Sequence, residues 1–118
     1  MKKTVFSLIL ILFSLNSFSS HLMGGEITWK CLKSGPDIGK YIFTMKVYRD
    51  CDGITVSTFT QQISVWNHPS VTSIDVDFLL NQDVSPTCDP INSGNPQLSC
   101  INGDIGAVEE YIFESLPI

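Results

Sequence analysis

Four cysteines are the residues of this sequence best able to form covalent links with one another. They are Cys31, Cys51, Cys88 and Cys100. No two of them have the Cys-x-x-Cys spacing typical of a zinc site, and an even number in an oxidising compartment indicates two disulfides. Four cysteines allow three different pairings. We favour Cys31–Cys51 together with Cys88–Cys100, because each link closes a short loop along the chain.

Acidic side chains offer one weak candidate for a metal site. Asp50 and Asp52 are two positions apart and precede Gly53, as in part of a calcium-binding loop. The third acidic ligand and the distal glutamate of such a loop are missing, so turn formation is the favoured interpretation. Glu109 and Glu110 are adjacent in an expected strand, so they point to opposite faces and cannot act on one substrate bond. We therefore predict no bound metal and no cofactor.

Nucleophilic catalysis has little support in the sequence. A Ser-His-Asp set needs a positioned histidine, and only His21 and His68 occur. His68 precedes Pro69 in an expected turn, and there is no Gly-x-Ser-x-Gly elbow. A copper site built from both histidines is a minor alternative, since imidazole is a good copper ligand. We predict that the protein is not an enzyme.

Aromatic side chains could form a sugar-binding platform, since their ring faces stack on the apolar faces of sugars. The candidates are Trp29, Tyr41, Tyr48, Trp66 and Tyr111. In β-sheet proteins such residues more often fill the core. We expect Trp29 and Tyr41 in the core and leave Trp66 open, because it borders a turn.

Strands must position all of these residues, because apolar and polar side chains alternate with a period of two through most of the chain. Strands are expected over residues 27–32, 40–50, 54–66, 71–80 and 108–115. The first two flank a short loop and are expected to form a hairpin. No stretch shows the 3.6-residue apolar period of a helix, and residues 81–106 are expected to form a long loop that a disulfide would order. The expected fold class is all-β, an Ig-like antiparallel β-sandwich that is incomplete.

The first nineteen residues have the features of a secretory signal peptide. Lys2 and Lys3 form a basic start, residues 5–15 are mostly apolar, and Ser17 and Ser19 supply small side chains for cleavage after Ser19. The apolar run is shorter than the roughly 20 residues that a membrane span needs. We therefore expect a signal peptide over residues 1–19 and a β-sandwich domain over residues 20–118. The domain would be secreted, extracellular or on the outer cell surface, with no transmembrane segment after cleavage.

The charge balance narrows the range of partners. The whole chain has seven basic and twelve acidic residues, for a formal net charge of −5. Two of the basic residues lie in the leader, so the remainder has five basic against twelve acidic residues, a balance of −7. An acidic surface repels phosphate backbones and anionic membrane surfaces. Nucleic acid is therefore not an expected partner.

Three short segments carry a resemblance to a known family. They are residues 21–28 (HLMGGEIT), 48–53 (YRDCDG) and 110–114 (EYIFE). Together they resemble the N-terminal region of large secreted surface proteins of Bacteroidetes, which often carry Ig-like or PKD-type repeats and a gliding-motility-associated C-terminal domain. The resemblance implies an extracellular or cell-surface β-domain that takes part in adhesion or gliding. Because the sequence ends on the apolar Leu116-Pro117-Ile118, we expect it to be the N-terminal part of a longer protein.

The function expected from these features is that of a structural or interaction module within a larger adhesin or gliding-motility-associated protein. Its partners would be other domains of a longer chain, cell-surface proteins or glycans. The alternative is a carbohydrate-binding module. Specific sugar binding that is lost on Trp66→Ala would favour that alternative.

Overall fold

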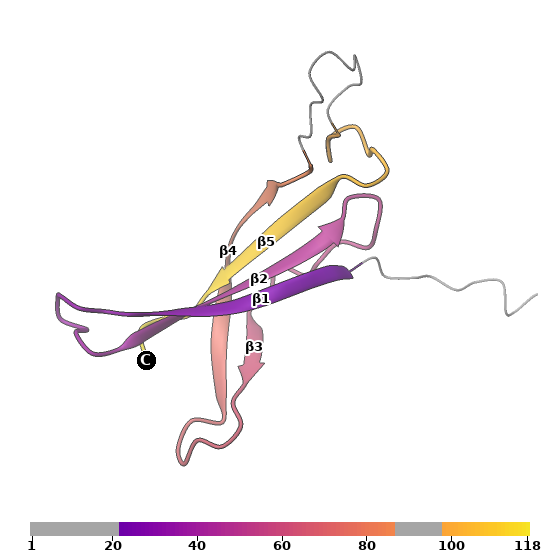
Figure 1. The fold of residues 1–118 in the computed structure, drawn as a ribbon. Coiled ribbons are helices and arrows are strands. Elements are labelled where there is room, and N and C mark those ends of the chain that lie inside the picture. The colour runs from indigo at the N-terminus through magenta and orange to yellow at the C-terminus, as the bar shows by residue number, and fades with distance from the viewer. Residues whose placement is uncertain (1–21, 87–97) are drawn as a thin grey trace, which may run out of the picture.

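A computed structural model describes residues 22–86 and 98–118 of the chain (Figure 1). These ranges contain five β-strands and no helix. The strands are β1 (Leu22–Cys31), β2 (Tyr41–Asp50), β3 (Gln61–Ser64), β4 (Ser73–Asp83) and β5 (Val108–Glu114). The all-β prediction is confirmed for the described residues. The signal peptide expected over residues 1–19 lies outside them.

The five strands form one antiparallel sheet in the order β1-β2-β5-β4-β3. The last strand, β5, lies between β2 and β4, so it joins the β1–β2 hairpin to the β3–β4 hairpin. β1 and β3 are the two edges of this sheet. The antiparallel arrangement agrees with the sequence prediction, whereas the described strands form a single curled sheet rather than two separate ones.

The β1–β2 hairpin has the predicted pairing of residues 27–32 with residues 40–50. Trp29 faces Phe43 and Ile27 faces Met45 in its register. The loop that joins the strands is closed by hydrogen bonds from Leu32 N to Lys40 O (2.8 Å) and from Gly39 N to Leu32 O (2.8 Å). Gly39 has a φ of 89°, a conformation that side-chain-bearing residues rarely adopt. The glycine therefore permits the chain to reverse here.

β4 is the strand that curls the sheet. Its register with β5 shifts between Phe78 and Leu80. Residues 73–76 of β4 pair with β3, and those from Asp77 onward pair with β5. The first half of β4 and β3 thus run across the face of β2 and β5 (Figure 1). This crossing brings a second layer of side chains over the middle of the sheet.

The core forms where these two layers meet. Four buried residues make its centre, namely Ile74, Val76, Tyr111 and Phe113. Side chains from β2 that alternate along the strand pack against them, as the period of two predicts; they are Phe43, Met45 and Val47. The rings of Phe78 and Phe113 meet edge to face with centroids 5.7 Å apart, a geometry that aromatic pairs prefer.

Two sequence predictions about the core and strands are wrong. Trp29 and Tyr41, expected in the core, are 67% and 43% exposed. The crossing layer covers β2 and β5 but not the edge strand β1, and Tyr41 lies at the end of β2 beyond its reach. The strand expected over residues 54–66 is also shorter, because only Gln61–Ser64 pairs with β4.

Candidate functional site

The described cysteines do not pair as predicted. Cys51 is bonded to Cys100, with Cα atoms 5.2 Å apart and a sequence separation of 49. This link excludes both favoured pairs, Cys31–Cys51 and Cys88–Cys100. Cys31 faces Tyr41 at one end of the hairpin, while Cys51 follows the other end of β2, ten residues or ~33 Å away along an extended strand. Cys31 is half-buried and free in the described residues, and Cys88 lies outside them.

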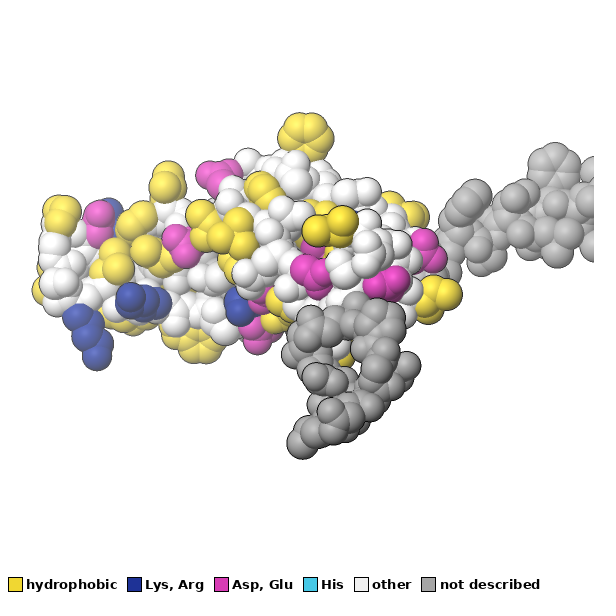
Figure 2. Space-filling model, turned by 90° about the horizontal axis from the view of Figure 1, so that it is seen from above, with side chains coloured by type: hydrophobic (Ala, Val, Ile, Leu, Met, Phe, Trp, Pro, Cys, Tyr) yellow, Lys and Arg dark blue, Asp and Glu magenta, His cyan; other side chains and the backbone are white. Residues whose placement is uncertain are grey.

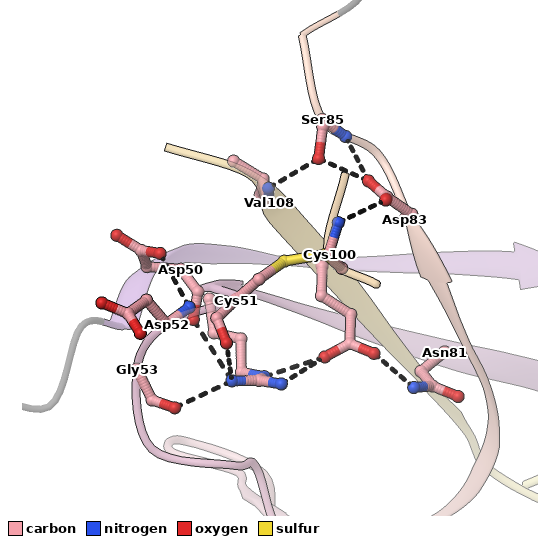
Figure 3. Close-up of polar contacts among 11 residues, drawn as sticks. Asp50, Cys51, Asp52, Gly53, Asn81, Asp83, Ser85, Cys100 and Val108 are labelled. Atoms are coloured by element: carbon pink, nitrogen blue, oxygen red, sulfur yellow. Dashed lines mark hydrogen bonds and ion pairs between the residues drawn. A yellow bond between two sulfur atoms is a disulfide. The ribbon is translucent and has the colours of Figure 1, made fainter. Parts of the chain in front are cut away.

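The segment around Cys100 is fixed by carboxylates that accept backbone hydrogen bonds. Cys100 N donates to Asp83 Oδ2 (2.8 Å), and Ser99 N donates to Asp104 Oδ2 (2.9 Å). Asp83 also accepts from the backbone N–H and the hydroxyl of Ser85 (Figure 3). The hydroxyl of Ser85, the N–H of Cys100 and the N–H of Ser85 hold the pKa of Asp83 below its ordinary value. The end of β4 thereby orients the disulfide.

The calcium candidates Asp50 and Asp52 lie in a tight turn beside this disulfide. Asp50 Oδ1 accepts a hydrogen bond from Asp52 N (3.0 Å), and Gly53 N donates to Asp50 O (2.9 Å) (Figure 3). Arg49 Nη1 donates to the backbone oxygens of Asp50, Cys51 and Gly53 at 3.2, 3.4 and 3.0 Å. The guanidinium group of Arg49 therefore binds the backbone oxygens that a metal ion in this turn would need as ligands. The hydrogen bonds of Asp50 are those of a tight turn. In residues 22–86 and 98–118, no three His, Cys, Asp or Glu side chains are grouped to hold a metal.

Arg49 and Glu109 link three strands on the core face of the sheet. Arg49 Nε and Nη2 lie 2.9 and 2.7 Å from Glu109 Oε2, and both side chains are largely buried, at 12% and 13% exposed. Glu109 Oε1 accepts from the amide of Asn81 on β4. The guanidinium carbon also lies 5.8 Å from the ring centroid of Tyr111, within cation–π range. The pair therefore ties β2, β5 and β4 together next to the disulfide.

Glu110 forms a separate network on the opposite face. Its Oε1 lies 3.1 Å from Lys46 Nζ and accepts a hydrogen bond from Tyr48 OH (3.1 Å), while Oε2 accepts from Gln82. The prediction that Glu109 and Glu110 point to opposite faces is confirmed by these contacts. Glu110 is buried, with only 3% of the whole residue exposed.

The Glu110 network predicts how stability depends on pH. Burial alone would raise the pKa of Glu110, but hydrogen bonds from Gln82, Lys46 and Tyr48 outweigh it and hold the pKa below the ordinary value. A carboxylate with a lowered pKa contributes stability at neutral pH, and that contribution is lost as pH falls through the pKa in the folded protein. We expect Glu110→Gln to cost about 2 kcal/mol at pH 7 and to flatten the loss of stability in acid.

Urea unfolding of wild type and Glu110→Gln at several pH values measures both effects. The matched control is Glu26→Gln, which alters another carboxylate bound to Lys46 and Tyr48. Glu26 is half exposed, so its loss should cost less than about 1 kcal/mol. Equal costs for the two variants, or an unchanged acid profile for Glu110→Gln, would contradict the expectation.

A cleft of about 680 Å³ opens at the other end of the sheet. Its walls come from the hairpin end of β1 and β2, the connection between β3 and β4, and the segment after β5. The residues that line it are Trp29, Tyr41, Phe43, Val65, His68, Val71, Ile74 and Ile118. Its volume is in the range of ligand-binding pockets, and its lining is almost wholly apolar.

Backbone contacts hold the walls of this cleft in place. Tyr41 N donates to Ile118 O (2.8 Å) and Ile118 N donates to Tyr41 O (3.0 Å), so the segment after β5 continues beside β2. His68 Nδ1 accepts hydrogen bonds from Ser70 N (3.2 Å) and Val71 N (2.9 Å). That nitrogen of His68 is therefore used within the loop, and His21, the other histidine of the copper alternative, lies outside the described residues.

The cleft revises the prediction of which aromatic residues are available to a ligand. Trp29 and Tyr41 line it, although the sequence placed both in the core. Trp66 is 86% exposed and is not among the lining residues. The sequence does not indicate Val65, His68 and Ile118 as lining residues. The crossing of β4 over β2 brings the first two near Trp29, and the pairing of the segment after β5 with Tyr41 brings Ile118 there. Figure 2 shows further apolar side chains standing out from the surface among charged ones.

The fold and the cleft together define an all-β, disulfide-bonded protein with an aromatic cleft at one end of a curled sheet. No family model, curated protein or solved structure matches the chain. The described ranges include no helix with the length and apolar character that crossing a membrane requires.

Proposed function

We propose that the chain is a secreted or cell-surface interaction module of a larger adhesin or gliding-motility-associated protein, and that it binds an apolar segment of a partner in the Trp29–Tyr41 cleft. The observation that carries this proposal is the cleft itself, with exposed aromatic side chains on the end of a hydrogen-bonded sheet. Aromatic side chains in pockets are the usual anchors of protein interfaces. The role is one of binding rather than catalysis.

Export and the Ig-like sandwich belong to the same proposal. The features of residues 1–19 support a signal peptide, and the Cys51–Cys100 disulfide is consistent with an oxidising, extracellular environment. β3 and the first half of β4 lie over β2 and β5 in the way that the second sheet of a sandwich would. A fuller second layer would make this arrangement Ig-like.

A carbohydrate-binding module is the second candidate, and the exposure of the two rings favours it. Trp29 and Tyr41 could stack on a sugar ring. Sugar sites also need several convergent hydrogen-bonding groups, however, and the lining offers only the Trp29 indole N–H, the Tyr41 hydroxyl and the His68 ring. The scarcity of polar groups makes an apolar peptide segment the better fit.

The test compares two tryptophan variants of the oxidised chain, residues 20–118, on an array of extended peptides and on a glycan array. We expect binding of apolar, aromatic-rich peptides, weakened at least tenfold by Trp29→Ala because a large buried contact is lost. Trp66→Ala is the matched control and should bind as wild type does, since Trp66 lies outside the cleft lining. Binding of specific glycans that Trp29→Ala abolishes would favour the second candidate. Binding that is insensitive to Trp29→Ala would refute both.

A further inference from the structure

The β1 edge presents a regular row of unpaired backbone groups. In the described part of the chain, β1 has a neighbour on one side only. The backbone groups of Tyr41 and Phe43 are bonded to Ile118 and Ser115 on the β5 side of β2, so the even-numbered residues of β2 face β1. Because the β1–β2 register pairs even residues with even ones, the odd-numbered residues of β1 point their N–H and C=O groups outward.

The part of β1 that is regular enough to pair with another strand is centred on one residue, Thr28. A register shift between Leu22 and Gly24 disturbs the beginning of β1, and from Gly24 to Cys31 the ladder is regular. Within it, the outward-facing residues run from Gly25 to Cys31, and Thr28 stands at the midpoint. The irregular start of β1 and the short regular stretch after it limit the length of a partner strand that could pair with this edge.

The side chains before and after Thr28 match in chemistry: opposite charges at equal distances from it on one face, and apolar groups on the other. Glu26 and Lys30 are two positions before and after Thr28 on one face, and Ile27 and Trp29 are one position before and after it on the other. Lys30 makes no ion pair within the described residues, and the side chain of Glu26 is 48% exposed. Ile27 and Trp29 are 49% and 67% exposed. The edge thus carries opposite charges and uncovered apolar groups at matching distances from its centre.

We propose that two copies of the chain pair antiparallel through their β1 edges, with the two-fold axis at Thr28. In this register Glu26 of each copy lies opposite Lys30 of the other. Ile27 lies opposite Trp29 of the other copy, an aromatic and β-branched pair of the kind that stabilises neighbouring strands. Because the contact is symmetric, each of these pairs occurs twice. The dimer interface then contains two Glu26–Lys30 ion pairs and buries the Ile27 and Trp29 side chains of both copies.

Charge complementarity selects this register over the neighbouring ones. The outward-pointing N–H and C=O groups belong to odd-numbered residues, so an odd residue of one copy must pair with an odd residue of the other. This requires a two-fold axis that passes at a residue rather than between two residues. The nearest alternatives to Thr28 are therefore axes at Ile27 and at Trp29. An axis on Ile27 places Glu26 opposite Thr28. An axis on Trp29 places Lys30 opposite Thr28 and brings the two tryptophans together. Neither alternative pairs Glu26 with Lys30.

A charge exchange tests the proposal in the oxidised chain. Sedimentation equilibrium should show a dimer, and Lys30→Glu should weaken it at least tenfold because Glu26 then faces a like charge. Glu26→Lys should weaken it similarly, and the double variant Glu26→Lys/Lys30→Glu should restore dimerisation. Lys33→Glu is the matched control, since Lys33 lies beyond the strand, and it should leave the dimer intact. Circular dichroism checks that all variants keep the β-sheet.

Cysteine cross-linking reads out the register. In a background with Cys31→Ser and Cys88→Ser, Thr28→Cys should form a disulfide-linked dimer at least tenfold faster than Ile27→Cys or Trp29→Cys. A chain that stays monomeric at millimolar concentration, or a dimer insensitive to Lys30→Glu, would overturn the proposal; capture of a foreign strand instead of a second copy would do the same. Trp29 takes part in both proposals, but Lys30 does not line the cleft, so Lys30→Glu separates them: the monomeric variant should still bind the peptides that Trp29→Ala rejects.

Discussion

Replacing both cysteines of the disulfide, in Cys51→Ser/Cys100→Ser, is expected to lower the free energy of unfolding by about 4 kcal/mol relative to the oxidised chain. The bond joins positions 49 residues apart, so it restricts a long loop of the unfolded chain. The core of the described residues is small, with four residues at its buried centre. A domain of this size has a narrow margin of stability, and this one cross-link supplies a large share of it.

Urea denaturation monitored by tryptophan fluorescence measures this effect, and the melting temperature should fall by roughly 15–30 °C. Cys31→Ser is the matched control. Cys31 is free in the described residues, so its replacement should cost less than about 1 kcal/mol. Peptide mapping of the oxidised protein should recover a fragment that joins Cys51 to Cys100. A Cys31-containing cross-link to either of these cysteines, or a large cost for Cys31→Ser, would show that the pairing is different.

Arg49→Met is expected to cost about 3 kcal/mol, because it leaves the largely buried carboxylate of Glu109 without its cation. The variant also loses the hydrogen bonds from Nη1 to the backbone oxygens of Asp50, Cys51 and Gly53. Methionine keeps much of the apolar stem of arginine, so the loss reports on the guanidinium group. The turn that carries Cys51 should therefore become less ordered.

Unfolding measurements on a double-mutant cycle separate the ion pair from the rest. Glu109→Gln alone should also destabilise, and the double variant Arg49→Met/Glu109→Gln should cost less than the sum of the two single changes. Lys33→Met is the matched control for removing an exposed charge and should change stability by less than about 0.5 kcal/mol. Additive costs for Arg49 and Glu109 would mean that their contact contributes little.

The faces of individual strands could be predicted from the sequence because they depend on local alternation. Phe43, Met45 and Val47 alternate along β2 and pack on the core, and Ile74 and Val76 do so from β4. The hairpin of β1 and β2 was predictable for the same reason, since its two strands are joined by a short loop. Side-chain direction in a strand is decided by the residue's own position, so one sequence is enough to assign it.

The features that depend on distant parts of the chain could not be predicted in this way. Short loops along the chain favour local disulfides, but the placement of β5 between β2 and β4 brings Cys100 to Cys51. Trp29 was assigned to the core because it alternates correctly, yet its strand lies at the edge where no layer covers it. The cleft requires the crossing of β4 over β2, which no local pattern indicates.

The position of β5 in the sheet has a consequence for how the molecule folds. Both hairpins can form from residues that are close in sequence. Within the described sheet they are joined through β5, the last of the described strands in chain order. Val47 of β2, for example, pairs with Tyr111, which is 64 positions later. Contacts between such remote residues slow folding, because a long chain must be ordered before they are gained. During synthesis, the apolar side chains of β2 and β4 would remain exposed to solvent or to chaperones until β5 pairs between them.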